Sequence, residues 1–424
     1  MTRKFRVMRA TLGLAGAAVL LAACSPSAPT PILAPTATPT PASEHTVRGV
    51  TDAHILFGQS VPLSGPTREL GEQVRLGIEA AFIEINDRGG VHGRQLDLLT
   101  LDDGYEPMAA IRNTVQLIED EHVFALIGAV GTPTSRAAAP IALEAGVPYI
   151  APFTGAAFLR SSEMSNVLNV RASYAQEVEV MVERLIADLG ISRIGVMYQN
   201  DSFGRDGYEG VRDALARRSM KPVAIGTYPR NTIAVKRGIL NLLEGDPQAV
   251  VIIGAYEPVA STLEWAKQSG PHAIFLTVSF AGGESLARAL SADTEIYVTQ
   301  VVPYPTDTSF PVVASYQQAL RHVAATAQPS HVSLEGYLMG RLAIHAAERC
   351  GQQIDRDCFV NGLREGGDFD IDGFSLSYDD AAWDKQGSDQ VYMTALDGSG
   401  AGLRQVENLR NARPIGAASD GASG

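Results

Sequence analysis

The sequence predicts an α/β protein made of two similar units, each with a parallel central sheet. From residue 54 onward, short apolar runs alternate with amphipathic stretches of helical length. Strands and helices in this order form parallel sheets that are covered on both faces. The alternation pauses near residue 152, restarts at residue 174 and continues to residue 300, so it describes two units of about equal size. A chain of 424 residues, 45% of them hydrophobic, is long and apolar enough to bury two cores.

The spacing of the apolar residues predicts each element of the first set. Leu70, Val74 and Ile78 recur every fourth residue, so residues 69–86 form a helix with one buried face. Pro107 suits the first turn of a helix and opens the next one. The predicted strands of this set are 54–59, 95–101, 123–128 and 148–152, and its helices are 69–86, 107–119 and 133–145.

The second set repeats the same order of elements. Its strands are apolar throughout, as in AVVIIG (249–254), which is typical of strands buried on both faces of a parallel sheet. The predicted helices are 174–189, 203–217, 235–243, 257–268 and 284–290, and the predicted strands are 193–198, 223–228, 249–254, 273–277 and 295–300.

The loops that follow the strands predict where a ligand binds. In open parallel sheets, ligands lie outside the carboxyl ends of the strands, where loops enter helix N-termini. Here these loops are rich in glycine, hydroxyl groups and single aromatic residues, which suits a small polar ligand held by backbone N–H groups and hydroxyls. The loops are PLSGP (62–66), GAVGTPTS (128–135), PFTG (152–155), QNDSFG (199–204), GAYE (254–257) and VSF (278–280).

Charge and motifs exclude several function classes. With 34 basic and 47 acidic side chains the net charge is −13, which argues against nucleic-acid binding because phosphate contacts need clustered cations. The eight histidines are scattered, and the glycine-rich loops give neither a full G-x-G-x-x-G nor a phosphate cradle. No G-x-S-x-G nucleophile motif is present. We therefore expect a binding protein without metal or cofactor, and not an enzyme.

The N-terminus predicts export. Four basic residues and no acid precede a small and apolar run at residues 10–23, which is the pattern of a secretory signal. The run ends in LAAC (21–24), which resembles the lipobox of bacterial lipoproteins. The resemblance implies cleavage before Cys24, lipid on its sulfur and stable anchoring in a membrane by two or three acyl chains. The alternative is a plain signal peptide in which Cys24 is accidental.

Two further segments are expected to lie outside the folded body. Proline recurs every few residues in SPSAPTPILAPTATPTPASEHTV (25–47), which predicts a semi-extended tether. Past residue 411, ARPIGAASDGASG lacks periodic apolar residues. We expect a signal peptide at 1–23, a lipidated cysteine and tether at 24–47, and a disordered tail at 412–424.

Several motifs of the body are characteristic in combination. They are PLSGPTRELG (62–71), INDRGGVHGRQL (85–96), DDGYEP (102–107), the stretch from GAVGTPTS to PFTG (128–155), QNDSFGRDGYEG (199–210) and SLEGY (333–337). In this order and at this spacing, the body from residue 53 to 407 resembles the type I periplasmic solute-binding proteins of the leucine/isoleucine/valine-binding kind. The resemblance implies two Rossmann-like lobes joined by three crossover segments, with the ligand in the cleft between them, as in a Venus flytrap.

The resemblance also assigns segments to the lobes. It implies crossovers near 170–174, 300–305 and 372–375, and places the helices of 309–366 in the first lobe. The strands at 374–376 and 391–395 are expected to return to the second lobe. Lobe I is then 52–171 plus 304–372, and lobe II is 174–301 plus 373–411.

The family's ligand contacts carry over only at matching positions. Thr132 matches the hydroxyl position that binds the ligand carboxylate, and Ser279 stands where amino-acid binders place a glutamate for the ammonium. A serine cannot balance an ammonium removed from water, so the resemblance supports a carboxylate or polar group better than an α-amino acid. Glu257 is the alternative partner for an ammonium. The implied ligand-binding residues are Ser64, Thr132, Thr154, Phe203, Tyr256 and Ser279, followed by Tyr105, Gly131, Phe153, Tyr174 and Glu257.

Two cysteines remain besides Cys24. Cys350 and Cys358 are eight positions apart between two predicted helices. In an exported protein they are expected to form a local structural disulfide, the alternative being two buried thiols.

The resemblance implies an extracytoplasmic, lipid-anchored and monomeric receptor. It would deliver an amino acid or similar small polar ligand to the permease and ATPase subunits of an ABC importer, after hinge closure of the lobes. One alternative is a sensor that reports the ligand to a signalling membrane partner without transport. A second is an enzyme acting on a nucleotide or sugar between the lobes.

Overall fold

A computed structural model describes residues 47–291, 294–365, 367–378, 387–396 and 402–415. Residues Thr46–Gly424 form one compact unit. The signal sequence, Cys24 and nearly all of the expected tether lie outside the described residues. Among the described residues, no helix is both long enough and apolar enough to cross a membrane.

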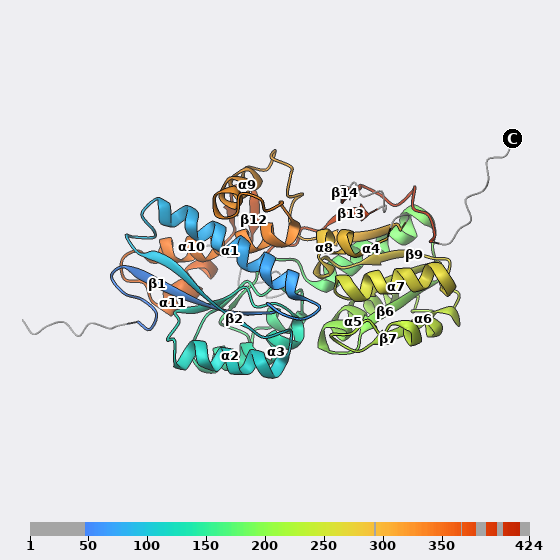
Figure 1. The fold of residues 1–424 in the computed structure, drawn as a ribbon, viewed down its shortest axis with the longest axis horizontal. Helices are drawn as coiled ribbons and strands as arrows, with labels where there is room; N and C mark the ends of the chain where they lie inside the picture. Colours follow the sequence, from blue (N-terminus) through green and yellow to red (C-terminus); the bar gives the residue numbers. More distant parts are fainter. Residues whose placement is uncertain (1–46, 292–293, 366, 379–386, 397–401, 416–424) are drawn as a thin grey trace, which may run out of the picture. The chain divides into compact units, whose positions relative to one another are not determined.

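Lobe I is built on a five-stranded parallel sheet with the order β2-β1-β3-β4-β5 (Figure 1). The long central pair is in register from His54 opposite Gln95 to Val61 opposite Asp102. The strands are β1 (His54–Val61), β2 (Gln95–Asp102), β3 (Ala125–Ile127), β4 (Tyr149–Ile150) and β5 (Val167–Leu168).

Helices cover both faces of this sheet. Helices α1 and α10 pack against each other on one face and α2 and α3 on the other (Figure 1), as right-handed crossovers require. The helices of lobe I are α1 (Arg68–Asp87), α2 (Pro107–Glu119), α3 (Thr132–Glu144), α9 (Pro311–Val323), α10 (His331–Cys350) and α11 (Arg356–Arg364).

Lobe II is built on a seven-stranded sheet with the order β14-β13-β10-β9-β8-β6-β7. The five strands from β6 to β10 are parallel, and β13 and β14 add antiparallel at one edge, so this sheet is mixed. The strands are β6 (Ile194–Gln199), β7 (Ile225–Tyr228), β8 (Ala249–Ile253), β9 (Ile274–Thr277), β10 (Ile296–Gln300), β13 (Tyr392–Leu396) and β14 (Arg404–Gln405).

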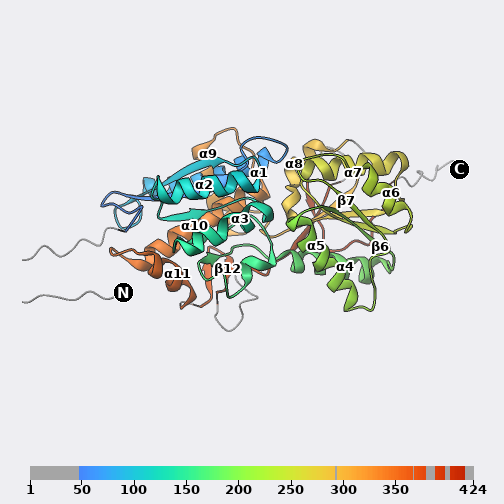
Figure 2. The same ribbon diagram turned by 90° about the horizontal axis from the view of Figure 1, so that it is seen from below.

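The helices of lobe II again lie on both faces of their sheet. Helices α4 and α5 pack together on one face, and α6, α7 and α8 lie on the other (Figure 2). They are α4 (Tyr174–Leu189), α5 (Ser202–Ala216), α6 (Lys236–Leu243), α7 (Tyr256–Ser269) and α8 (Gly283–Ala289). The two expected sets of alternating strands and helices are therefore present, with ends that shift by two residues or fewer.

One strand lies elsewhere than expected. Residues 374–376 do not return to the sheet of lobe II; β12 (Phe374–Leu376) pairs antiparallel with β11 (Phe369–Ile371) in a separate two-stranded sheet. Asp372 and Gly373 form the two-residue turn, both with positive φ, and an Asp-Gly pair favours this hairpin. The ring of Phe369 stacks on His345 of α10, with centroids 4.6 Å apart, so the hairpin packs on lobe I.

Candidate functional site

Three buried hydroxyl groups meet where the carboxyl ends of the two sheets face each other. Thr132 is the first residue of α3, Thr154 follows β4, and Tyr174 is the first residue of α4 in lobe II. All three are fully buried. The Oγ1 atoms of Thr132 and Thr154 are 2.7 Å apart, and Thr154 Oγ1 lies 3.3 Å from the Tyr174 hydroxyl. These contacts form a short hydrogen-bonded chain from one lobe to the other.

Gly131 allows this loop to approach its neighbours. It precedes α3 with φ +98°, and a Cβ atom there would lie 2.2 Å from a ring carbon of Tyr105. A side chain at this position would therefore collide with Tyr105 and strain the backbone. The first turn of α3 can thus lie beside the ring of Tyr105, where Thr132 and Thr134 carry backbone N–H groups, Pro133 has none and the Ser135 N–H donates to Gly131 O.

Aromatic rings from both lobes surround these hydroxyls. Phe280 lies at the centre, with its ring centroid 6.0 Å from Tyr105, 5.6 Å from Phe153 and 4.5 Å from Phe203. Tyr174 extends the group, 5.2 Å from Phe203. Tyr105 and Phe153 belong to lobe I, whereas Phe203 and Phe280 belong to lobe II, so the group spans the junction. We call these five residues the aromatic cluster.

Arg171 joins the aromatic cluster to buried carboxylates. It lies in the first crossover, fully buried, with its guanidinium carbon 4.7 Å from the ring centroid of Phe153. Its Nη2 atom donates to Ser279 Oγ and lies 3.4 Å from Glu177, and its Nη1 atom is 3.6 Å from Glu335 Oε1 of α10. Within the part of the chain that the structure describes, neither Nε nor Nη1 has a hydrogen-bond partner.

Glu177 accepts hydrogen bonds from donors of lobe II and from Arg171. Its Oε2 atom accepts from the Ser279 amide at 2.8 Å and from the Thr299 hydroxyl at 2.6 Å. Its Oε1 atom accepts from Ser279 Oγ at 3.0 Å and from Arg171. The main chain and side chain of Ser279 are therefore both committed to this carboxylate.

Burial and neighbouring charges act in opposite directions on the pKa of Glu335, and they also oppose each other at Arg171. Desolvation raises the pKa of Glu335 to about 7, although the nearby Arg171 lowers it. Desolvation also acts against the charged form of Arg171, but Glu335 and Glu177 outweigh it and the pKa of Arg171 is raised. Arg171 therefore stays cationic, while Glu335 takes up a proton near neutral pH.

A second polar contact crosses the junction at Tyr105. Gln199, at the end of β6, lies 3.4 Å from the Tyr105 hydroxyl and donates to Asp201 Oδ2 at 2.7 Å. Asp201 Oδ1 caps α5 by accepting from the amides of Phe203 and Gly204. Asp201 is thus a helix cap whose carboxylate is already satisfied.

The rim of the junction is held by polar pairs between the lobes. In lobe II, Arg230 Nη2 and Asn231 Nδ2 donate to Glu106 of lobe I at 2.8 and 2.7 Å. On another side, His331 Nδ1 of α10 lies 2.7 Å from Glu284 Oε1 of α8. These pairs bring loops and helix ends of the two lobes into direct contact.

The structure gathers most of the site residues that the resemblance implied. Thr132, Thr154, Phe203, Tyr105, Gly131, Phe153 and Tyr174 lie in or beside the aromatic cluster. Ser279 precedes Phe280 but is turned to Glu177 and Arg171. Ser64 is exposed in its loop. Tyr256 and Glu257 begin α7 and lie near Glu69 of α1. Burial is the main cause that raises the pKa of both side chains, and the negative charge of Glu69 is the second; the pKa of Tyr256 is raised to about 12.

Sequence reasoning missed the centre of this arrangement. Phe280 directly follows Ser279 as the single aromatic residue of its loop, and Arg171 is a lone cation among apolar and small neighbours in NVRASYA. Glu335 is the only acidic residue in the wholly buried first half of α10. A charge inside a buried run signals a paired or functional group, and it could have drawn attention to both residues.

The structure shows how the two cysteines of the body are paired and how the possible metal ligands are distributed. Cys350 and Cys358 are joined by a disulfide with a Cα–Cα distance of 5.8 Å, linking the end of α10 to α11. Among the residues that the structure describes, no group of three or more His, Cys, Asp or Glu side chains is placed to hold a metal ion.

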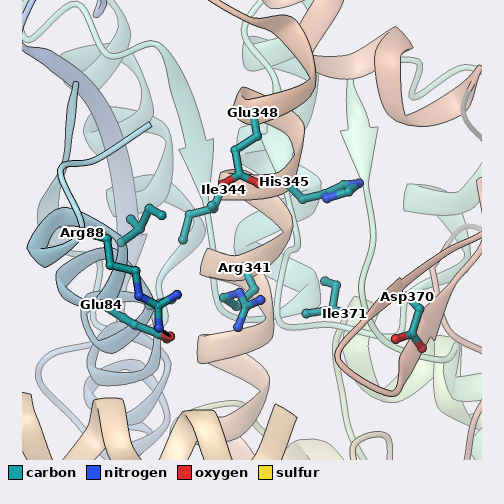
Figure 3. Close-up of a pocket in the computed structure, with 10 residues that line it drawn as sticks. Glu84, Arg88, Arg341, Ile344, His345, Glu348, Asp370 and Ile371 are labelled. Carbon is teal, nitrogen blue, oxygen red and sulfur yellow. Dashed lines mark hydrogen bonds and ion pairs between the residues drawn. The ribbon is translucent and has the colours of Figure 1, made fainter. Parts of the chain in front are cut away.

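A cavity of about 100 Å³ lies in lobe I, away from the aromatic cluster (Figure 3). It is lined by the C-terminal halves of α1 and α10 and by the β11 hairpin, and its labelled side chains include Glu84, Arg88, His345 and Asp370. Arg88 and Glu84 pair with each other at 2.6 Å. The charges of Arg88 and Glu84 are therefore paired within lobe I.

Comparison with known proteins identifies the family. A family model described as "Periplasmic binding protein" matches residues 54–401. The chain belongs to this family. Among curated proteins, this periplasmic binding protein is 26% identical over 313 residues to "Leu/Ile/Val-binding protein homolog 7" of Brucella abortus (strain 2308), covering 70% of this chain and 77% of that protein.

Solved structures give the same result. The crystal structure of "a possible leucine/isoleucine/valine-binding protein" from Rhodopirellula baltica SH 1 is 37% identical, with a TM-score of 0.78, covering 86% of this chain and 98% of that one. An isoleucine complex of a branched-chain amino acid transporter substrate binding protein from Streptococcus pneumoniae has a TM-score of 0.70 at 20% identity, covering 83% of this chain and 99% of that one. The second likeness concerns the fold alone. The type I periplasmic binding fold is therefore confirmed.

Proposed function

We propose that this periplasmic binding protein is an exported lipoprotein that captures a small ligand between its lobes and delivers it to an ABC importer. Membership of the periplasmic binding protein family, with a relative named "Leu/Ile/Val-binding protein homolog 7", supports ligand capture rather than catalysis. The lipobox-like LAAC (21–24) supports a lipid on Cys24 and a position outside the cytoplasm. Permease and ATPase subunits would be the partners, and the receptor would act as a monomer.

The observation that carries the proposal is the aromatic cluster with its hydroxyl chain. Tyr105, Phe153, Thr132 and Thr154 come from lobe I, whereas Phe203 and Phe280 come from lobe II. A ligand that touches both sets is bound best when the lobes are closed, so binding shifts the population toward the closed form. Moving such an equilibrium from mostly open to mostly closed requires about 5 kcal/mol of preferential binding.

The test is a thermal-shift screen of the purified protein against amino acids, amides and small carboxylates. A ligand at one hundred times its dissociation constant should stabilise the protein by about 2.7 kcal/mol. Small-angle scattering with the same ligand should show a smaller radius of gyration. A verified tight ligand that leaves the scattering curve unchanged would contradict hinge closure.

A matched pair of variants tests the position of the site. Thr132→Ala should weaken binding of the ligand at least tenfold. Thr262→Ala is the control, because Thr262 is equally buried but donates to Pro258 within α7. Equal affinity of the two variants would place the ligand elsewhere.

A further inference from the structure

Two acids beside the aromatic cluster, Glu177 and Asp201, already have hydrogen-bond donors. Glu177 already receives hydrogen bonds from Ser279, Thr299 and Arg171. Asp201 caps α5 and receives Gln199. An ammonium that is buried without a carboxylate costs several kcal/mol, so these two acids offer it no compensation.

Glu335 does not fill this role either. No described residue donates a hydrogen bond to its Oε1 atom, but this atom lies 3.6 Å from Arg171 Nη1. An ammonium placed there would sit beside a guanidinium and be repelled by it. Since burial also raises the pKa of Glu335 to about 7, its negative charge is only partial near neutral pH.

Groups that can donate hydrogen bonds to an anion, in contrast, lie close to the aromatic cluster. Thr132 and Thr154 carry hydroxyls beside the first turn of α3, whose N-terminal N–H groups favour an anion. Arg171 adds a second, independent observation: it is fully buried, and its Nε and Nη1 atoms have no hydrogen-bond partner among the described residues. Its guanidinium lies over the ring of Phe153 and 5.8 Å from that of Tyr174, the residue whose hydroxyl ends the hydroxyl chain.

The apolar part of the junction is aromatic on both sides. Phe280 is in ring contact with Phe153 and Tyr105 of lobe I and with Phe203 of lobe II, at centroid distances of 4.5–6.0 Å. Rings at these separations attract each other beyond the effect of their buried area. A flat ring that enters between the lobes would find the same partners.

We infer that the ligand is an aromatic carboxylate without an α-amino group, held by the aromatic cluster and by the donors of Thr132, Thr154 and Arg171. This inference rests on the proposed function, since it names the ligand class of the same site. The carboxylate would face the hydroxyl chain, and the ring would pack among Phe280, Phe203 and Phe153.

Two pairs of probes test the ammonium and the ring separately. 3-Phenylpropanoate and L-phenylalanine differ only by the amino group, and so do 4-methylpentanoate and L-leucine. Calorimetric titration of the purified full-length protein should give at least one hundredfold tighter binding for each amine-free acid than for its amino acid. 3-Phenylpropanoate should bind about tenfold more tightly than 4-methylpentanoate.

A variant of the aromatic cluster tests whether its rings cause the preference for an aromatic acid over an aliphatic one. Phe280→Leu should reduce the affinity for 3-phenylpropanoate about tenfold and abolish its advantage over 4-methylpentanoate. Phe275→Leu is the control: Phe275 is equally buried, within β9, and this change should lower the melting temperature without altering the preference between the two acids.

The outcomes separate this inference from the proposed function. Tighter binding of L-leucine or L-phenylalanine than of the matching acid would overturn the ligand class while leaving the receptor function intact. Binding of a library compound but of none of the four probes would have the same meaning. If no compound of the library or the probe set binds, both proposals fail.

Discussion

At the scale of single residues, Glu335 makes the stability of the protein depend on pH. Its pKa is raised by burial from an ordinary value of 4.5 to about 7 in the folded protein. Between these two values the folded state binds more protons than the unfolded state, so the free energy of unfolding falls as the pH rises. The stabilisation from this group is therefore present below pH 4.5 and is lost as the pH rises through about 7.

We expect Glu335→Gln to remove this part of the pH dependence. From pH 5 to pH 7.5, wild type should lose up to ~3 kcal/mol of unfolding free energy relative to the variant, at about 1.4 kcal/mol per pKa unit. Urea unfolding at several pH values measures the difference, and other titrating acids cancel because both proteins contain them. Glu119→Gln, at an exposed position, should leave the profile unchanged. A constant difference between wild type and Glu335→Gln would show that Glu335 keeps its charge.

At the scale of elements, the packing of α1 on α10 depends on glycines at their contact. A Cβ atom on Gly77 would lie 2.1 Å from the Ser333 carbonyl oxygen, and one on Gly336 would lie 2.4 Å from the Val74 carbonyl oxygen. The helices thus approach each other backbone to backbone. Because the buried first half of α10 also carries Glu335, this contact fixes where that carboxyl meets Arg171.

Gly77→Ala should therefore destabilise lobe I despite the higher helix propensity of alanine. Overpacking at such a contact costs about 1–3 kcal/mol, and here the obstacle is backbone, which cannot move aside cheaply. The matched control is Gly362→Ala in α11, where the nearest atom to the added methyl is 3.9 Å away. That change should be neutral or stabilising by up to ~1 kcal/mol. Chemical denaturation measures the free energy of unfolding of both variants. If the two values are similar, α1 and α10 are less closely packed than the structure shows.

At the scale of the whole molecule, contacts between the lobes would bias the proposed equilibrium between open and closed forms. Glu106 receives both Arg230 and Asn231 from the opposite lobe. These side chains are partly exposed, so each contact contributes little, about 0–1 kcal/mol, to stability. If the open and closed forms have similar free energies, even a contact of this strength changes their relative populations several-fold.

Glu106→Ala should shift the unliganded protein toward the open form. We expect a larger radius of gyration without ligand, a two- to tenfold weaker affinity for the ligand found by the screen, and an almost unchanged melting temperature. Glu121→Ala, an exposed position on the same lobe, is the control. Scattering and titration measure both quantities; identical values for the two variants would show that the Glu106 contacts do not influence closure.

Local sequence patterns were sufficient for much of this fold. The apolar spacing of α1, the proline that opens α2 and the continuous apolar run of β8 each depend on neighbours within a few residues. The Asp-Gly pair at 372–373 is a local hairpin signal of the same kind, whereas the family resemblance implied a strand at 374–376 in lobe II that the structure instead pairs with β11.

The sequence by itself determined two sets of alternating strands and helices, and with them the edge at which Thr132, Thr154 and Phe203 lie. Only the tertiary structure decided that Phe280 occupies the centre, that Ser279 turns to Glu177, and that Arg171 meets Glu335 across 164 positions of the chain. The reason is physical: periodic apolar residues specify which face of an element is buried, because that depends on local geometry. Which buried groups face each other depends on how whole elements pack, and no local pattern encodes it.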